Sequence, residues 1–544
     1  MSPPSETEVR GSRRARQLGL SIGVVLFLVL LLLPGLPLDG TQRRVAAVTG
    51  LTATLWITVA LPVGATSLLP AALFPLLGVM PMSEAAPLYM THLVMLFIGA
   101  FIVALGLERW NVHRRIALWI ISKVGGDPAR LVLGFMAAAA FLSLWINNTA
   151  TTLLMLPIAT AVLARVLGDD EGRSPFALAL LLGIAYASSV GGMGTPVGTA
   201  PNQEFLGQFD RRFPDAPSIG FGQWFLGWGP LVLLFVPLGW LVLTRLAFRV
   251  ERKGNDAGEV IAEERARQGP LSGAQKRMGI MFGLTALLWV TRADLTLGEL
   301  HLPGWATLLL GEERGGYVTD ATVASLMAVL CFVIPGDRGE PLMDWKTAVR
   351  LPWEVLLLLG AGFCIAHAFK VSGLDVALGS GLAPLLEGTS TWVIVFVVVV
   401  FMSLLTEVTS NTATTAVLLP VIASAGVAAG INPLLVMAPA TIAASSAFMM
   451  PVRQAASKSA SIKPFKSSRA SAPSEYSITK CGMTFSRSRP SSCDDLTVVD
   501  RSPLDDGLDN GDVLYAFFRN RHDIVGQNDH IGILARFYRS DFVL

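Results

Sequence analysis

Long apolar runs recur along the chain, separated by short polar or charged segments. A helix needs about 20 apolar residues to cross a bilayer. Runs approaching or exceeding this length cover residues 18–36, 86–107, 224–246, 278–290, 319–335 and 353–371. They lack the alternation of apolar and polar positions that a transmembrane β-barrel requires. The pattern therefore predicts an all-α polytopic membrane protein lying in a lipid bilayer.

The basic residues give this bundle an orientation. They cluster at 13–16, 109–123 and 249–277, and such clusters stay in the cytoplasm. Residues 1–17 are therefore expected to be cytoplasmic. The same orientation places Arg43 and Arg44 on the outside, which violates the rule. The run after residue 17 is expected to be a retained anchor instead of a signal peptide, because it is long and lacks a small-residue cleavage site.

Two charged segments lie between the apolar runs. Residues 108–123 mix Trp and Ile with Arg at helical spacing, which predicts a helix lying along the inner membrane surface; an ordinary cytoplasmic loop is the alternative. Residues 249–277 read as a solvated cytoplasmic linker. This linker divides the membrane region into a first half, 18–248, and a second half, 278–452.

The two halves share a motif. The sequence NNTATTLLMLPIA begins at Asn147 and SNTATTAVLLPVIA begins at Ser410, which places the Asn-Thr pairs 263 positions apart. Arg130 and Arg165 flank the first copy, whereas no Lys or Arg occurs from 371 to 452 around the second. These charges predict re-entrant hairpins over about 129–166 and 391–429 that enter from opposite sides. Such an arrangement is typical of inverted-repeat transporters with broken helices.

The residue types at the hairpin tips indicate what they bind. Polar backbone is tolerated at membrane depth only where it is buried or lines a watery cavity. An Asn amide can donate its N–H groups to a carboxylate and coordinate a sodium ion through its oxygen, and a helix N-terminus favours an anion. Neither hairpin core contains Lys or Arg, so we expect bound sodium ions to balance the charge of an anionic substrate.

A Gly- and Pro-rich stretch follows the first hairpin. Residues 188–202 read SSVGGMGTPVGTAPN within a predicted helix at about 175–212, and they are expected to break that helix and expose carbonyl ligands. A simple kink between packed helices is the alternative. Residues 433–452 are expected to begin the equivalent broken helix of the second half.

Two Asn-Thr hairpin tips in register resemble those of the divalent anion:sodium symporter family, over roughly residues 18–452. The resemblance implies cotransport of sodium with dicarboxylates such as succinate, fumarate, malate or citrate, a homodimer, and a bacterial inner membrane location. It implies that substrate is bound by Asn148, Thr149, Asn411 and Thr412. It implies that sodium is bound by Ser143, Asn147, Asn148, Gly191, Gly192, Gly194, Gly198, Thr406, Thr409, Ser410 and Asn411. Asn147 departs from the family, which usually has Ser there.

Two further polar residues lie in apolar segments. Glu407 follows Thr406 on the second hairpin, and it either handles a cation or, the reading we favour, holds the hairpin by a hydrogen bond to a neighbouring helix. His367 is expected to be a packed histidine and not a proton relay.

The composition changes class near residue 452. Where the repeat predicts a second Gly-Thr-Pro-Asn-like break, the chain continues Arg453-Gln454, and residues 453–544 are polar with no run of spanning length. We interpret 453–544 as the product of a reading-frame shift, with a genuine disordered tail as the alternative. The chain lacking the second break is expected to be poorly folded or inactive.

Overall composition narrows the function class. Of the 544 residues, 52% are hydrophobic and 15% charged, with a net charge of +2, so nucleic acid is not an expected partner. The four cysteines show no paired or metal-binding spacing. A membrane-embedded enzyme would need a reactive cluster of side chains, and the sequence shows none. A channel would need a continuous polar pore instead of two blind hairpins. The sequence predicts a sodium/dicarboxylate symporter working by alternating access, with an inorganic-anion carrier such as a sulfate transporter as the alternative.

Overall fold

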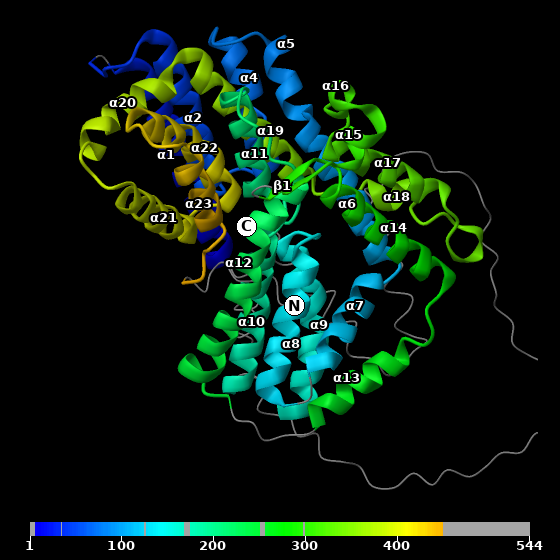
Figure 1. Ribbon diagram of the computed structural model, residues 1–544. Coiled ribbons are helices and arrows are strands. Elements are labelled where there is room, and N and C mark those ends of the chain that lie inside the picture. The colour runs from blue at the N-terminus through cyan, green and yellow to red at the C-terminus, as the bar shows by residue number, and fades with distance from the viewer. Residues whose placement is uncertain are drawn as a thin grey trace, which may run out of the picture. The chain divides into compact units, whose positions relative to one another are not determined.

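The computed structural model describes residues 6–33, 35–124, 127–167, 174–250, 256–297 and 300–449. Within these ranges almost all regular structure is helical (Figure 1). The first-half helices are α1 (Glu6–Leu32), α2 (Gly40–Thr58), α3 (Val63–Thr66), α4 (Leu69–Leu76), α5 (Met82–Ala85), η1 (Ala86–Met90), α6 (His92–Arg109), α7 (Val112–Val124), α8 (Pro128–Ser143), α9 (Asn148–Leu167), α10 (Pro175–Met193), α11 (Ala200–Arg212), α12 (Phe221–Leu241) and η3 (Val242–Ala247).

The remaining elements lie in the linker and in the second half of the chain. They are α13 (Asp256–Arg267), α14 (Gly273–Val290), β1 (Leu295–Leu297), β2 (Leu300–Leu302), α15 (Trp305–Leu310), α16 (Glu312–Gly315), α17 (Asp320–Val333), η4 (Asp337–Gly339), α18 (Trp345–Ala348), α19 (Trp353–Ser372), α20 (Leu374–Leu386), α21 (Thr391–Val408), α22 (Asn411–Ala428) and α23 (Leu434–Ala444). The two short strands pair antiparallel, with Leu295 opposite Leu302. Sequence patterning did not predict this small sheet.

The apolar runs predicted from the sequence all coincide with helices. In the described part of the chain, eight helical segments are long and apolar enough to cross a membrane. They are Arg14–Leu32, Met82–Arg109, Asn148–Leu167, Pro175–Met193, Phe221–Ala247, Trp353–Ser372, Thr391–Val408 and Asn411–Ala428. The prediction of a helical polytopic membrane protein is confirmed.

The helix α2 was not predicted, because its apolar residues are interrupted by Thr and Gly and preceded by Arg43 and Arg44. It packs along α1, where a Cβ on Gly50 would lie 2.9 Å from a Leu30 methyl carbon. Arg44 donates to the carbonyl oxygen of Leu77 at 2.9 Å, just beyond the end of α4. A cation at a helix C-terminus is favourable, which gives the apparent violation of the charge rule a structural reason.

The predicted linker, 249–277, is more structured than expected. It contains the helix α13, which packs against α7 and α9, and its last residues already belong to α14. Arg115 on α7 donates to the carbonyl oxygens of Gln268, Gly269 and Pro270 at 2.7–3.0 Å. The helix α7 covers most of the segment 108–123 that was predicted to lie along the inner membrane surface, and its buried face includes His113, Leu118 and Ile121. The region therefore packs onto the first half of the bundle.

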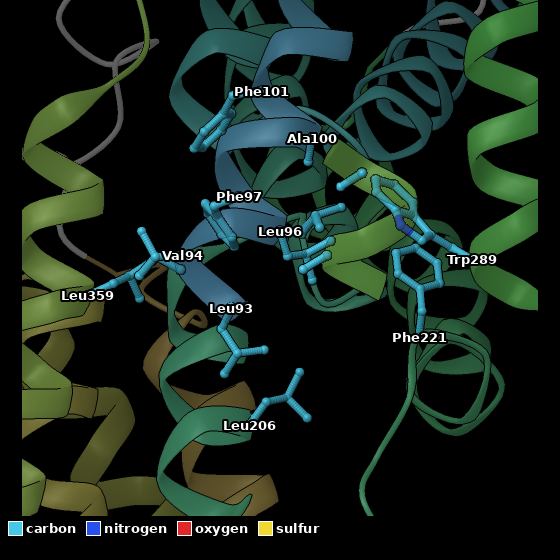
Figure 2. Packing of buried hydrophobic residues seen from close by; sticks show 14 of the residues in the cluster. Leu93, Val94, Leu96, Phe97, Ala100, Phe101, Leu206, Phe221, Trp289 and Leu359 are labelled. Carbon is cyan, nitrogen blue, oxygen red and sulfur yellow. The ribbon is translucent and has the colours of Figure 1, made fainter. Parts of the chain in front are cut away.

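Buried side chains form three clusters that hold the helices in place. The largest joins α6 to α11, α12, α14, α17 and α19, and Figure 2 shows Leu93, Val94, Leu96 and Phe97 of α6 at its centre. The second cluster joins α7, α8, α9, α10 and α12. The third joins α2 and α4 to α19 and α22. Trp145 in the turn of the first predicted hairpin packs against the first cluster, and Ala413, just after the second tip, belongs to the third, so packing holds both tips in place.

Candidate transport site

The first predicted hairpin is formed by α8 and α9, with a four-residue turn at 144–147. Asn147 accepts the backbone N–H of Ala150 through Oδ1 at 2.8 Å, which caps the start of α9. Ser143, at the end of α8, donates its hydroxyl to Oδ1 of Asn148 at 2.9 Å. The tip thus fixes the Asn148 amide beside the N-terminus of a 20-residue helix, where an anion is favoured.

The predicted broken helix consists of α10 and α11, interrupted at 194–199. Asn202 is fully buried, and its amide Nδ2 donates to the carbonyl oxygens of Gly192 at 3.0 Å and Thr195 at 2.7 Å. The hydroxyl of Thr195 donates to the carbonyl oxygen of Leu144 in the hairpin turn. Side chains therefore fix the break in one conformation, so it is a built loop and not a simple kink.

The hairpin tip touches the break at two glycines. A Cβ on Gly192 would lie 2.3 Å from Oδ1 of Asn148, and one on Gly198 would lie 2.5 Å from the Gly192 carbonyl oxygen and 2.8 Å from the Ser143 carbonyl oxygen. Only glycine permits this approach, because real Cβ contacts are not so short. The result is a gathering of uncharged oxygen atoms, the donor set that hard cations prefer.

The second predicted hairpin, α21 and α22, repeats this geometry. Thr406 donates its hydroxyl to Oδ1 of Asn411 at 2.7 Å and also contacts the carbonyl oxygen of Ala444, at the end of α23, at 2.7 Å. Thr406 and Asn411 lie 263 positions after Ser143 and Asn148. The repeat detected in the sequence is therefore also a repeat of side-chain contacts.

The two hairpins approach the break from opposite ends of the α10–α11 path. The first hairpin's α8 runs parallel to α10, since Met136 lies against Gly183 and Ala140 against Gly191. The second hairpin's α22 runs parallel to α11, since Gln208 donates to the carbonyl oxygen of Ala416 at 3.2 Å and Arg212 further along contacts Ser424. Figure 1 shows the same order, with α8 and α9 beside α10, and α22 beside α11.

The other residues implied by the resemblance take different places. Thr149 is exposed on the first turn of α9, whereas Thr412 is buried. Thr409 lies in extended backbone before α22, and its hydroxyl bonds to Leu405 O at 2.7 Å and to the Thr414 hydroxyl at 2.5 Å. Ser410 is the N-cap residue of α22 without a side-chain capping bond.

Two predicted sodium ligands have structural roles at the first tip. Gly191 is the point at which α10 crosses α8, since a Cβ there would lie 2.3 Å from the Ala140 carbonyl oxygen. Gly194 lies against Leu144 of the turn. The structure assigns the Asn147 amide oxygen to helix capping, and Asn202 and Thr195 emerge as organising residues. Both belong to the predicted Gly- and Pro-rich stretch, 188–202, so the polar residues within that stretch were the signal that could have identified them.

The structure also assigns partners to the two isolated polar residues. Glu407 accepts the backbone N–H of Met449, beyond α23, at 2.8 Å. The sequence interpretation favoured a hydrogen bond to a neighbouring helix; the bond is present, but its partner lies beyond the end of α23 and not within a helix. The expectation of a merely packed His367 was incomplete, because its Nε2 lies 2.6 Å from Oε1 of Glu84. The two residues are 283 positions apart, so the sequence offered no local signal for this contact.

Comparison with known proteins places this geometry in a family. The family profile described as the sodium:sulfate symporter transmembrane region matches residues 14–460. The chain belongs to this family. It is a multi-pass membrane transporter of the secondary type and not an enzyme.

Curated relatives within the symporter family are similar over most of their length. The sodium-dependent dicarboxylate transporter SdcS of Staphylococcus saprophyticus is 39% identical over 445 residues, covering 80% of this chain and 83% of the relative. SdcS of Staphylococcus aureus strain MSSA476 is 38% identical over 448 residues with the same coverage. Among solved structures, a chain of Neisseria gonorrhoeae MtrF, described as illuminating a class of antimetabolite efflux pumps, matches at 14% identity with a TM-score of 0.48. The match covers 84% of this chain and 90% of that one.

Proposed function

We propose that this symporter-family chain couples the entry of sodium ions to the import of C4-dicarboxylates such as succinate, fumarate and malate by alternating access. The observation that carries the proposal is the pair of hydroxyl–amide contacts, Ser143 to Asn148 and Thr406 to Asn411, at the tips of two opposed hairpins. The printed names of the curated relatives supply the substrate class. Cotransported sodium would be held by the oxygen atoms around Gly192 and Gly198 and by those around Thr406.

We propose that both hairpins are re-entrant and that their tips meet at the substrate between two inverted repeats. Their bases lie among different charged groups. The base of the first adjoins α13, which is rich in Glu and Arg, and the end of the second lies beside the Arg212–Asp375 ion pair. Asn148, Thr149, Asn411 and Thr412 would bind the two carboxylates, with amide donors and two helix N-termini facing the anion.

The need to keep the occupied substrate site electrically neutral explains why transport would require sodium. A divalent anion taken from water into a site without Lys or Arg would carry a large desolvation cost unless cations accompany it. In the hairpins 129–166 and 391–429, the Lys and Arg residues are Arg130, at the start of α8, and Arg165, near the end of α9. Both lie at the ends of their helices away from the tip, so bound sodium ions supply the missing charge. Empty and fully loaded forms are then favoured for movement over a form loaded with anion alone.

The relatives and the exposed faces support a proposal for the membrane setting and the assembly. Both relatives are bacterial, which supports a cytoplasmic-membrane location. The apolar helices α1, α12 and α21 are largely unburied within one chain, as suits contact with lipid or with a second subunit. We propose a homodimer on the strength of the family resemblance.

The predicted polar tail, 453–544, lies outside the described residues. We propose that it is an out-of-frame product, and the end of the family match at residue 460 supports this. Sequencing the gene tests the idea directly: a neighbouring frame should encode a Pro-Asn break and an apolar helix, and its absence would contradict the proposal. We call the version with that frame restored the frame-corrected chain.

The substrate assignment is tested by uptake into proteoliposomes. The frame-corrected chain, under an inward sodium gradient, should accumulate labelled succinate and not labelled sulfate. The 544-residue chain, tested in parallel, should accumulate neither. The description of the family profile favours sulfate as the second candidate, and sodium-driven sulfate uptake without succinate uptake would replace the dicarboxylate with that anion.

A further inference from the structure

A carboxyl group lies buried where the two halves of the bundle meet. Glu204 is on the second turn of α11 and is fully buried, 0% exposed. Its carboxyl lies flat against α19, since a Cβ on Gly362 would be 2.5 Å from Oε1 and 2.6 Å from Oε2. Buried carboxylates are rare unless they are paired with a cation or fully hydrogen-bonded.

Glu204 forms no ion pair in the described part of the chain, and Arg211, two turns later on α11, acts on its carboxyl electrostatically without contacting it. Arg211 and Arg212 are the cations of α11; the first lies over the Phe363 ring at 4.7 Å and the second pairs with Asp375. On α19, Lys370 donates to the Arg211 carbonyl oxygen. The remaining titratable groups of these helices are Asp210, which would add negative charge, and Glu354, Cys364 and His367 of α19. The helices α22 and α23 contain no Asp, Glu, Lys, Arg, His or Cys.

One hydrogen bond reaches the carboxyl from within its own helix. Gln208, one turn later, donates through Nε2 to Oε1 of Glu204 at 2.7 Å and to the carbonyl oxygen of Ala416 on α22 at 3.2 Å. A carbonyl oxygen only accepts, so the bond to Ala416 fixes which end of the amide is nitrogen. Both amide hydrogens are then in use.

One oxygen atom of each side chain has no hydrogen-bond partner within the described chain: Oε2 of Glu204 and Oε1 of Gln208. These are the two atoms that a carboxylic acid and an amide join when they pair in a ring. In that ring the amide N–H donates to the acid carbonyl, and the acid O–H donates to the amide oxygen. A single proton on Oε2 would therefore satisfy both atoms, whereas an ionised carboxylate would leave both unsatisfied at a large cost.

Neighbouring groups do not offer the same solution. Asn202 and Gln203 each have one unpartnered amide oxygen as well, but these are neutral groups whose N–H groups already bond to carbonyls of the break. A sodium ion at Glu204 would need several more oxygen ligands, and the α19 backbone occupies the space at Gly362. A proton requires no such space.

We propose that Glu204 is a proton-binding site, protonated from solvent and closed into an acid–amide ring with Gln208 at the junction of α11, α19 and α22. The site is separate from the proposed sodium ligands, which lie at the break before α11 and around Thr406. The proton keeps α11 neutral where it packs against the second half of the bundle. The proposal does not rest on the transport function, and its test needs only folded protein.

Infrared difference spectroscopy on the full 544-residue chain, with the frame-corrected chain in parallel, tests the proposal. The carbonyl stretch of a protonated carboxylic acid lies apart from carboxylate bands. At neutral pH this band should be present in the wild-type protein, absent in Glu204→Gln and retained in the control Glu84→Gln, whose carboxyl is 41% exposed. Identical spectra for the wild-type and Glu204→Gln proteins would contradict the proposal. Loss of a sodium-sensitive carboxylate band in Glu204→Gln would also contradict it, because Glu204 would then be ionised in the wild-type protein.

Stability provides an independent readout. Gln at position 204 can form the same ring without a proton, so Glu204→Gln should fold at every pH tested. Because the folded wild-type protein holds a proton that the unfolded chain releases, its stability should fall relative to the variant by up to about tenfold in the unfolding equilibrium constant per pH unit above pH 5. Failure of Glu204→Gln to fold, or parallel melting temperatures from pH 6 to pH 9, would overturn the proposal.

Discussion

The approach of Gly192 to Asn148 gives the sharpest prediction about the first sodium site. In Gly192→Ala, the new Cβ would lie 2.3 Å from Oδ1 of Asn148 and 3.1 Å from the Gly198 carbonyl oxygen. Ordinary contact begins near 3.4 Å, so the Asn148 amide must move by about 1 Å. It cannot move that far and keep its 2.9 Å bond from the Ser143 hydroxyl.

The magnitude follows from what this movement breaks. Loss of the Ser143–Asn148 hydrogen bond costs about 1 kcal/mol, and displacement of a coordinating oxygen weakens ion binding further. Together these effects should raise the sodium concentration for half-maximal uptake by at least tenfold, which corresponds to about 1.4 kcal/mol. The helix itself is not weakened, because Ala is a better helix former than Gly by about 1 kcal/mol.

The assay is sodium-dependent succinate uptake by the frame-corrected chain in proteoliposomes, measured over a range of sodium concentrations. The matched control is Gly279→Ala in α14, where a Cβ meets nothing within 4 Å and the gain in helix propensity is the same. The control should match the wild-type protein. Wild-type sodium dependence in Gly192→Ala would refute the assignment of this contact to a sodium site.

Two further substitutions test the second hairpin and the packing of the bundle. Thr406→Val removes the hydroxyl that contacts both the Asn411 amide and the end of α23, so it should raise the sodium concentration for half-maximal uptake about tenfold. The control Thr285→Val loses only a hydrogen bond to its own helix and should leave that concentration unchanged. Asp375→Asn leaves Arg212 without its buried partner and should lower stability by about 3–5 kcal/mol, measured as a fall in melting temperature. Arg267→Gln, at an exposed pair, should change stability by less than about 1 kcal/mol, and equal effects of these two changes would contradict the packing argument.

Local signals explain why much of the architecture could be predicted from the sequence. Helices α9 and α22 begin at Asn148 and Asn411, as the shared motif indicates, because Asn and Ser are favoured immediately before a helix. Asn147 caps α9 through its side chain, and Ser410 is the N-cap residue of α22. The break between α10 and α11 follows from Gly and Pro at 191–201. These features depend on residues within a few positions of each other, so a single sequence contains them.

Contacts between distant segments could not be predicted in this way. The pairs His367–Glu84 and Gln208–Ala416 join residues more than 200 positions apart. Glu204 itself resembles an ordinary polar residue after a break, and only its packing against α19 shows that it is buried without an ion pair. Tertiary packing, and not residue type, gives these side chains their roles.

The central claim is that the two hairpin tips form one sodium-coupled dicarboxylate site. Its most direct test is succinate uptake by the frame-corrected chain with Asn148→Ala and Asn411→Ala, made singly, with and without a sodium gradient. The account predicts sodium-driven uptake in the parent protein and its loss in both variants, with each variant still folded by size-exclusion chromatography. Uptake that persists in either folded variant, or that needs no sodium in the parent, would contradict it.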